Sequence, residues 1–253
     1  MPTEKIRLRR IDHPTPKQNH LLAALPAADY ESLLPQLELV RMPRGWAVFE
    51  SAGQHGYVYF PATSLVALPY VIADTSSTQS AVVGNDGVVG IALIMGGKST
   101  PRHAVVQSAG DGFRLNANLL KHHFDRGGPV QHLLLRYAQA LITQTAQTAA
   151  CNRHHAVEQQ LCRWLLLSLD RVPLSELTMA QDLFANMPEV QREGASAAAA
   201  ELQAAGLIHY SRGKISVLDR AKLEARVCEC YSLVKREYER LLSPAVILAS
   251  LAG

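Results

Sequence analysis

The chain has 253 residues with a formal net charge of +3, and 48% of its residues are hydrophobic and 19% charged. These values fit a folded protein of one or two domains and exclude a disordered or fibrous chain. No apolar run of about 18 residues is present, and the N-terminus lacks the apolar core of a signal peptide, so we expect a cytoplasmic protein that does not enter a membrane.

The charge is concentrated at the N-terminus. Residues 1–18 hold five basic residues against two acidic ones, and we expect them to form a flexible basic tail. Residues 19–151 balance at eight against eight, and residues 152–253 at twelve against twelve. The C-terminal half therefore has no excess of basic residues, so any binding of phosphate depends on how its charges are arranged.

The first folded segments are helical and then change to short strands. Residues 19–34 have leucines at helical spacing and predict two short helices, separated near Pro26. From about residue 38 to 120 the sequence has short Val-, Tyr- and Phe-rich segments separated by Gly, Pro and Asp, which predicts an antiparallel β-sandwich or barrel. The expected strands are LELVRMP, AVFESAG, YVYFPA, SLVALPYVI, SAVVGNDG, VVGIALIMGG, HAVVQSAG and GFRLNA.

A long helix is predicted after the Gly-Gly-Pro sequence at 127–129. Between residues 130 and 151, positions four and three apart are apolar in the first half and polar in the second, as in a coiled-coil seam. We interpret them as a dimer seam, while the alternative is a core helix packed on the sandwich. The seam consists of Val130, Leu134, Tyr137, Leu141, Gln144, Thr148 and Cys151.

The C-terminal third predicts a winged helix-turn-helix. A helical stretch at 152–173 is followed by a short helix capped by Thr178, and a second helix runs from about Gln191 to Gly206. A two-stranded hairpin with Ser-Arg-Gly at its tip comes next, and this order of parts is that of the winged motif. The tail from 220 to 242 is again helical.

The cysteines are Cys151, Cys162, Cys228 and Cys230, without a CxxC pair or spaced cluster. We interpret them as reduced thiols and expect no metal site, because two cysteines two apart on a helix point to different sides. The chain shows no Ser/His/Asp order, paired carboxylates, phosphate-cradling glycine loop or metal spacing, so we expect it not to be an enzyme.

The order of these parts resembles the Crp/Fnr family of bacterial transcription regulators over residues 19–231. The resemblance is carried by GWAVFESAG, YVYFPATSLVAL, VVGNDGVVG, PRHAVV, CNRHHAVEQQLCRWLLLSLDRV and LQAAGLIHYSRGKISVLD. It implies an α+β chain with a jelly-roll, cyclic-nucleotide-binding-like sensor domain at 19–128, a dimerisation helix at 129–153 and a winged helix-turn-helix domain at 154–253. It also implies a homodimer on a palindromic double-stranded DNA operator, with RNA polymerase left open as a further partner.

The resemblance assigns an effector region but does not identify the effector. In family members that bind cyclic AMP, a glycine followed by glutamate holds the ribose, and an arginine followed by serine holds the cyclic phosphate. This chain has Gly90 followed by Ile91, and Arg102 followed by His103. Isoleucine cannot accept a hydrogen bond from a sugar hydroxyl, so cyclic AMP in the usual pose is not expected. Arg102 suits a phosphate or carboxylate, or else pairs with an acid on the sheet.

Other sensing chemistries follow from the same comparison. The iron–sulfur cluster of oxygen-responsive members is not expected, because no cysteine precedes Cys151. Haem stays open, as do a cyclic dinucleotide and a regulator without any ligand. The histidines that could bind haem are His20, His55, His103, His122, His123 and His132.

Alignment of the Leu207-Ile208 dipeptide with the family places Arg192 and Glu193 at its first two base-reading positions and Ala197 at the third. Arginine can bind guanine in a bidentate way, and glutamate can accept from cytosine. Wing residues are expected to contact phosphate oxygens, and Arg153, His154 and His155 mark the hinge. The expected DNA-binding residues are Gln191, Arg192, Glu193, Ser196, Ser211, Arg212 and Lys214.

The dimer implies that an effector in the sandwich shifts the seam and changes the spacing of the two reading helices. A competing interpretation is a nucleotide sensor whose helix-turn-helix has become a protein-binding surface. The alanine-rich reading helix and the balanced charge of the C-terminal half favour that alternative.

Overall fold

Strands from the N-terminal half form two antiparallel sheets that face each other. In this computed structural model the described residues are 14–49, 56–72, 76–97, 104–173, 176–177, 189–211 and 214–243. One sheet has the order β1-β7-β3 and the other β2-β6-β4-β5. The strands are β1 (Glu38–Met42), β2 (Ala47–Phe49), β3 (Tyr57–Pro61), β4 (Leu65–Ile72), β5 (Ser76–Val83), β6 (Ala104–Ser108) and β7 (Gly110–Asn116).

Glycines set the close packing of β7 against its neighbours. A Cβ added at Gly112 would lie 2.7 Å from Met42 Sδ and 3.0 Å from the Phe60 carbonyl oxygen. One added at Gly110 would lie 2.5 Å from the backbone carbon of Thr63. Any larger residue at these positions would force the strand away from the sandwich core.

The lead-in helices are fixed to the sandwich by one buried asparagine. Asn19 is fully buried and caps α1 (His20–Ala23), because its Oδ1 accepts from the backbone of Leu21 and Leu22. Its Nδ2 donates to the carbonyls of Pro61 and Gly87, at 2.9 and 2.8 Å. The other elements of this region are η1 (Pro16–Gln18), α2 (Ala27–Leu33) and η2 (Leu34–Gln36).

One expected strand is a helix. The segment VVGIALIMGG contributes only an isolated bridge between Val89 and Tyr59 and then forms α3 (Ile91–Ile94). The cause is Gly90, whose φ of 99° takes the chain out of the extended conformation and starts the helix. The apolar residues of the segment pack on the core in either conformation, so their composition did not distinguish the two.

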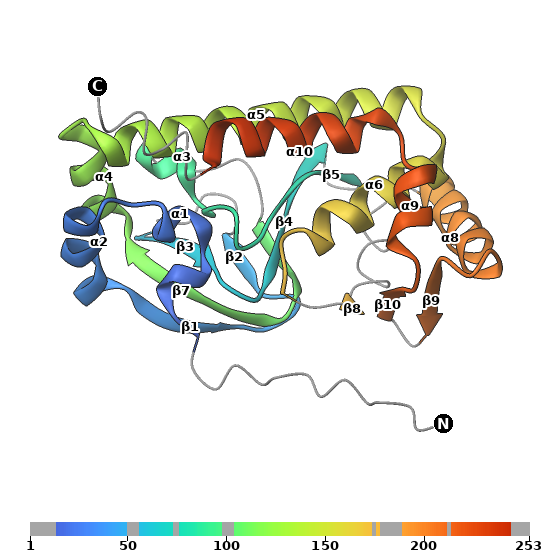
Figure 1. The fold of residues 1–253 in the computed structure, drawn as a ribbon, viewed down its shortest axis with the longest axis horizontal. Coiled ribbons are helices and arrows are strands. Elements are labelled where there is room, and N and C mark those ends of the chain that lie inside the picture. Colours follow the sequence, from blue (N-terminus) through green and yellow to red (C-terminus); the bar gives the residue numbers. More distant parts are fainter. Residues whose placement is uncertain are drawn as a thin grey trace.

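Two long helices cover one side of the molecule. After α4 (Ala117–Asp125), α5 (Pro129–His154) runs along the long axis of the molecule, and α10 (Glu229–Leu242) lies beside it (Figure 1). Pro129 takes the first position of α5, where a missing N–H costs nothing. The tail helix therefore packs along α5, outside the winged part with which the sequence grouped it. None of the described helices is long and apolar enough to cross a membrane.

The winged part occupies the opposite end of the molecule from α2 and α4 (Figure 1). A small antiparallel sheet has the order β8-β10-β9. The elements are α6 (Val157–Leu169), β8 (Glu176–Leu177), α8 (Glu189–Ala204), β9 (Ile208–Ser211), β10 (Lys214–Val217) and α9 (Arg220–Arg226). The expected short helix at 178–188 lies outside the described residues.

Candidate functional site

Helix α8 presents one face to solvent and buries the other against α6. The buried side includes Leu202, which is fully buried, and the solvent side includes Glu193 and Ser196. The alanines divide between the two faces: Ala195, Ala198 and Ala199 are buried, while Ala197 and Ala200 are exposed. The buried alanines therefore allow α8 to pack closely on α6. The exposed alanines leave an outer surface without long side chains, on which the helix backbone is accessible.

A glycine sets the approach of α8 to α6. A Cβ added at Gly194 would lie 3.4 Å from Val157 Cγ2, at the limit of ordinary contact. The far end of α8 is tied to the wing, because Gln203 Oε1 accepts a 2.6 Å hydrogen bond from the Tyr210 backbone N–H. Gly206, with φ of 71°, turns the chain from the helix into the wing.

The structure locates the predicted DNA-binding residues on two neighbouring elements. Gln191 and Arg192 lie in the first turns of α8, and their side chains are outside the described set. Glu193 and Ser196 follow on the exposed side of α8. Ser211 and Lys214 are both exposed and oppose each other across the β9–β10 hairpin, whereas Arg212 lies outside the described residues.

The predicted dimer seam is wrong, because the protomer itself covers those side chains. Every one of the seven positions is less than 9% exposed within the single chain. Tyr137 donates a 3.0 Å hydrogen bond to the Val88 carbonyl, and Gln144 donates to the Val82 carbonyl at 3.2 Å. The alternative of a core helix is what the structure shows. The buried positions are Val130, Leu134, Tyr137, Leu141, Gln144, Thr148 and Cys151.

The polar half of that face takes part in a buried network of hydrogen bonds and one ion pair between the sandwich and the winged part. We call this network the Arg171 hub; it consists of Arg171, Asp86, Gln144 and Tyr238. Arg171, just after α6, forms a 2.8 Å ion pair with Asp86 and donates to Gln144 Oε1 at 3.2 Å. Tyr238 of α10 donates to the same Gln144 oxygen at 2.8 Å, and its ring lies 4.7 Å from the guanidinium. Burial raises the pKa of Tyr238, so this hydroxyl stays protonated.

The turn at 84–88 is enclosed by the hub on one side and by α5 on the other. A Cβ added at Gly84 would lie 2.3 Å from the Arg171 carbonyl oxygen, and one at Gly87 would lie 2.6 Å from Tyr137 Oη. The backbone N–H of Asn85 also donates to the Arg171 carbonyl at 3.0 Å. Movement of this turn would therefore directly change its contacts with Arg171, at the end of α6.

The expected effector residues are only partly within the described chain. Gly90 caps α3, and Ile91 is half-buried and packs on the hydrophobic core. Arg102 and His103 lie outside the described residues. A cleft of about 440 Å³ opens elsewhere, between the lead-in helix, α6 and α10. It is lined in part by His20, Asp86, Asp170, Arg171, Tyr238 and Glu239.

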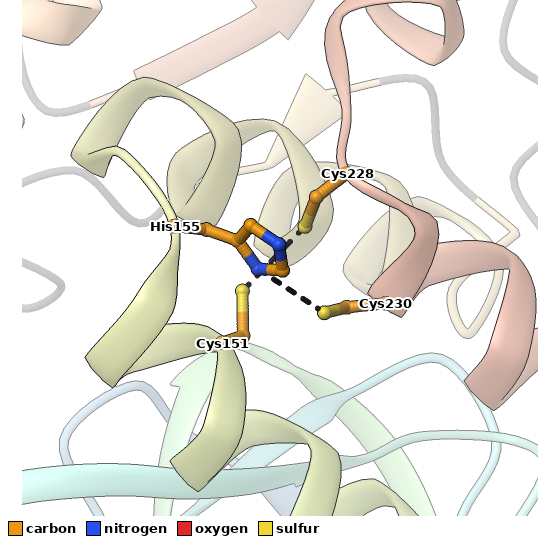
Figure 2. Close-up of side chains that lie close together, drawn as sticks. All are labelled: Cys151, His155, Cys228 and Cys230. Carbon is orange, nitrogen blue, oxygen red and sulfur yellow. Dashed lines mark hydrogen bonds between the residues drawn. The ribbon is translucent and has the colours of Figure 1, made fainter.

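Four side chains of types that can bind a metal meet where α5 ends and α10 begins (Figure 2). The donor atoms of Cys151, His155, Cys228 and Cys230 all lie within 4.8 Å of one another. The expectation of unrelated thiols fails here because Cys228 is the residue before α10, with an extended ψ of 164°, rather than part of the helix. Both sulfurs of the Cys-x-Cys pair can then point inward. The spacing of Cys151 and His155, which are four residues apart as on one face of a helix, was the signal in the sequence, although His155 itself is the residue just after α5.

The histidines considered for haem do not converge. His20 lines the cleft, and His132 is exposed on α5. His122 and His123 are neighbours on α4, with ring centroids 6.2 Å apart, while His55 and His103 are outside the described residues. Among the described residues, His155 is the histidine that belongs to a potential metal-binding group.

Comparisons with known proteins identify the C-terminal domain and show which solved structures have a similar fold. Residues 159–226 match the Crp-like helix-turn-helix domain. No curated protein matches the sequence. The chain is similar in structure to a protein from Eubacterium rectale described as a transcriptional regulator of the Crp/Fnr family, with a TM-score of 0.62 and 15% identity, covering 83% of this chain and 98% of that one.

Two further solved structures give the same result. FixK2 from Bradyrhizobium japonicum is similar at a TM-score of 0.61 and 14% identity, over 76% of this chain and 98% of that one. The c-di-GMP-responsive regulator CLP from Xanthomonas campestris is similar at 0.58 and 18% identity, over 77% of this chain and 100% of that one. At these identities the structural likeness shows the fold, and the domain match identifies the helix-turn-helix.

Proposed function

We propose that this chain, which contains a Crp-like helix-turn-helix domain, is a Crp/Fnr-like transcription regulator that acts as a dimer and binds a palindromic operator under the control of an effector in its sandwich domain. The observation that carries this proposal is the exposed face of α8 beside the wing, within the matched residues 159–226. A helix of this kind enters the major groove with its N-terminal turn.

Base reading is assigned to the start of α8 and phosphate binding to the wing. Arg192 would bind O6 and N7 of a guanine, Glu193 would accept from a cytosine amino group, and Gln191 and Ser196 would add hydrogen bonds. The exposed Ala197 and the low surface after it let this end of the helix approach the bases. The wing supplies Ser211, Arg212 and Lys214 to phosphate oxygens.

Dimerisation is assigned to the outer face of α5, which the protomer leaves exposed. Leu135 and Ile142 are 44% and 64% exposed, which is unusual for large apolar side chains. They belong to a set at spacings of four and three residues, the spacing of a coiled-coil seam. The members of this outer seam are Leu135, Gln139, Ile142, Ala146 and Ala149. The small alanines allow the two helices to approach closely.

The effector is expected to act on the turn at 84–88 and the Arg171 hub. The turn follows β5, and it contacts both α5 and the end of α6, so a ligand that favours one arrangement of the turn changes the position of the winged part. Ile91 packs on the core, which supports an effector other than cyclic AMP in the usual pose. One similar structure is of a c-di-GMP-responsive regulator, so cyclic dinucleotides belong among the test ligands.

The test is selection of genomic fragments by the purified full chain, followed by binding measurements at two or more salt concentrations. Specific binding should weaken as salt rises, because phosphate contacts release counterions. Arg192→Ala should lose about 1–3 kcal/mol and relax specificity at one base pair per half-site. Lys214→Ala should weaken binding to all sequences alike and reduce the salt slope by about one.

Lys121→Ala is the matched control, because Lys121 pairs with Asp125 on α4 in the sensor half. Its DNA affinity should equal that of the wild type. If no fragment is enriched and binding does not depend on salt, the DNA-binding proposal fails and the competing interpretation of a protein-binding surface is favoured. If DNA binds but Arg192→Ala leaves the sequence preference unchanged, the alignment of the reading helix is wrong.

A further inference from the structure

The Cys151, His155, Cys228 and Cys230 cluster lies at both chain connections of the helix-turn-helix domain. The domain match spans residues 159–226. The chain enters it through the end of α5, which carries Cys151 and leads to His155, and leaves it through Cys228 into α10, which carries Cys230. Residues more than 70 positions apart in the sequence are thus brought to one point (Figure 2).

The donor spacing fits one tetrahedral ion. Zn–S bonds of about 2.3 Å and Zn–N bonds of about 2.0–2.1 Å place neighbouring donors of a tetrahedron about 3.5–3.8 Å apart. Here Cys151 Sγ lies 3.6 Å from Cys228 Sγ, and Cys230 Sγ lies 3.4 Å from His155 Nδ1. The widest pair is at most 4.8 Å apart, which a small side-chain rotation closes. An iron–sulfur cluster contains several bridged iron atoms, so its cysteine sulfurs lie farther apart than the sulfurs of this group.

Surrounding groups support the donors as they do in protein metal sites. His155 Nε2 lies 3.3 Å from Glu229 Oε1, so the imidazole can donate to the carboxylate while Nδ1 faces the sulfurs. Gln147 Nε2 donates to Cys230 Sγ at 3.0 Å. The guanidinium of Arg163 is buried close enough to act electrostatically on Cys151, and its Nη1 donates to Thr148 Oγ1 at 2.8 Å while its Nε has no hydrogen-bond partner among the described residues. Its positive charge offsets the net negative charge of three thiolates around a divalent ion.

The cluster is buried but still reachable. Cys151, Cys228 and Cys230 are at most 4% exposed, as expected for a closed structural site. The His155 side chain is 22% exposed and Glu229 is 67% exposed, so this edge of the site faces solvent. An ion can therefore reach the donors without unfolding of the domain.

We propose that Cys151, His155, Cys228 and Cys230 form a structural site for one Zn²⁺ ion, with Glu229 orienting the histidine. A borderline-soft ion without a preference of its own for coordination geometry suits three thiolates and one imidazole. The bound ion joins the end of α5 to the start of α10 and so fixes both connections of the helix-turn-helix domain. The proposal does not depend on DNA binding and is tested without DNA.

The experiment uses the full chain purified without a histidine tag under reducing conditions. Metal content is measured by plasma mass spectrometry, and the metal-free chain, prepared with a chelator, is titrated with Co²⁺ and with Zn²⁺ against a chromophoric chelator. We expect one zinc ion per chain, and a Co²⁺ spectrum with tetrahedral ligand-field bands and strong thiolate charge-transfer bands. Zinc should also raise the melting temperature of the metal-free chain.

Cys228→Ser, Cys230→Ser and His155→Gln should each weaken zinc binding by more than 100-fold, and Glu229→Gln by about 10–100-fold. The matched controls are Cys162→Ala, since Cys162 lies outside the cluster, and His154→Gln, the exposed neighbour of His155. Both controls should bind zinc like the wild type. Melting curves in excess chelator show whether each variant folds.

The proposal is overturned if the reduced wild-type chain binds no zinc or gives a Co²⁺ spectrum without thiolate bands. This result requires no variant, so a folding defect cannot obscure it. The proposal is equally overturned if the folded Cys230→Ser chain keeps the wild-type zinc affinity.

Discussion

Replacement of Arg171 by methionine is the sharpest test of the connection between the sandwich and the winged part. The Arg171 side chain is 3% exposed and contacts Asp86, Gln144, the Leu167 carbonyl and the Tyr238 ring. Methionine has a similar length and fills the space, but it leaves the other groups without their positive partner. The substitution therefore isolates the electrostatic role of the hub from its packing.

The expected loss follows from the burial of the partners. Removal of one member of a buried ion pair costs about 3–5 kcal/mol, because the remaining charge has no partner. Asp86 is 18% exposed, so water reaches it in part and the lower end of this range applies. Gln144 loses one of two donors to its Oε1 but keeps the bond from Tyr238. We expect Arg171→Met to lower the free energy of unfolding by about 3 kcal/mol.

The assay is urea unfolding followed by circular dichroism, with Asp86→Asn and the double variant completing a cycle. The double variant should be more stable than the sum of the single losses indicates, because no uncompensated charge remains. Arg240→Met serves as control, since Arg240 forms an exposed pair with Glu237, and it should leave the stability close to that of the wild type. A loss in Arg171→Met no larger than in this control would refute the hub as a stabilising link.

Three further predictions concern the proposed dimer, the packing of α8 and the response to pH. If the chain forms that dimer through the outer face of α5, Ile142→Glu should give a monomer in sedimentation velocity, whereas an unchanged dimer would place the interface elsewhere. Gly194→Ala should be neutral or stabilise by up to about 1 kcal/mol through helix propensity, while Gly194→Val should destabilise by about 1–3 kcal/mol because it presses on Val157, both measured by urea unfolding. Burial raises the pKa of Cys162 to about 12, so the stability it contributes is complete below pH 9 and is lost as pH rises toward 12. Cys162→Ala should make the fall in stability above pH 9 shallower by up to about 1.4 kcal/mol per pH unit, and an identical slope would contradict the burial of that thiol.

The sandwich and the winged helix-turn-helix could be predicted because local rules decide them. Short apolar segments with regular turns indicated the strands outside residues 88–97, although β5 begins at Ser76, four residues before its expected segment, and Gly206 marked the end of α8. The segment at 88–97 could not be assigned correctly, since a buried strand and a buried short helix have the same apolar composition. The left-handed Gly90 decides between them, and its conformation depends on the surrounding fold.

Two predictions were wrong for the same reason: the dimer seam on α5, and the expectation that the cysteines lie apart. A spacing of four and three residues shows that a helix has a buried face, but it does not show what covers that face. The tail helix α10 and residues 84–88 supply the cover for Gln144 and Tyr137, and neither is near them in the sequence. The same return of α10 brings Cys228 and Cys230 to Cys151. Helical periodicity therefore predicted the buried side correctly and its partner wrongly.

Helix α6 is held to the rest of the molecule near both of its ends, and this limits how a signal can move the winged part. The cysteine and histidine cluster lies just before its first residue, and the Arg171–Asp86 ion pair lies just after its last. About 20 Å separates the ends of a helix of this length. If zinc fixes the first end as proposed, a shift of the turn at 84–88 would act on the second end and would rotate α6 about the metal site. Arg171→Met should then reduce the effect of an effector on DNA affinity while zinc binding stays intact, a separation that global unfolding cannot produce.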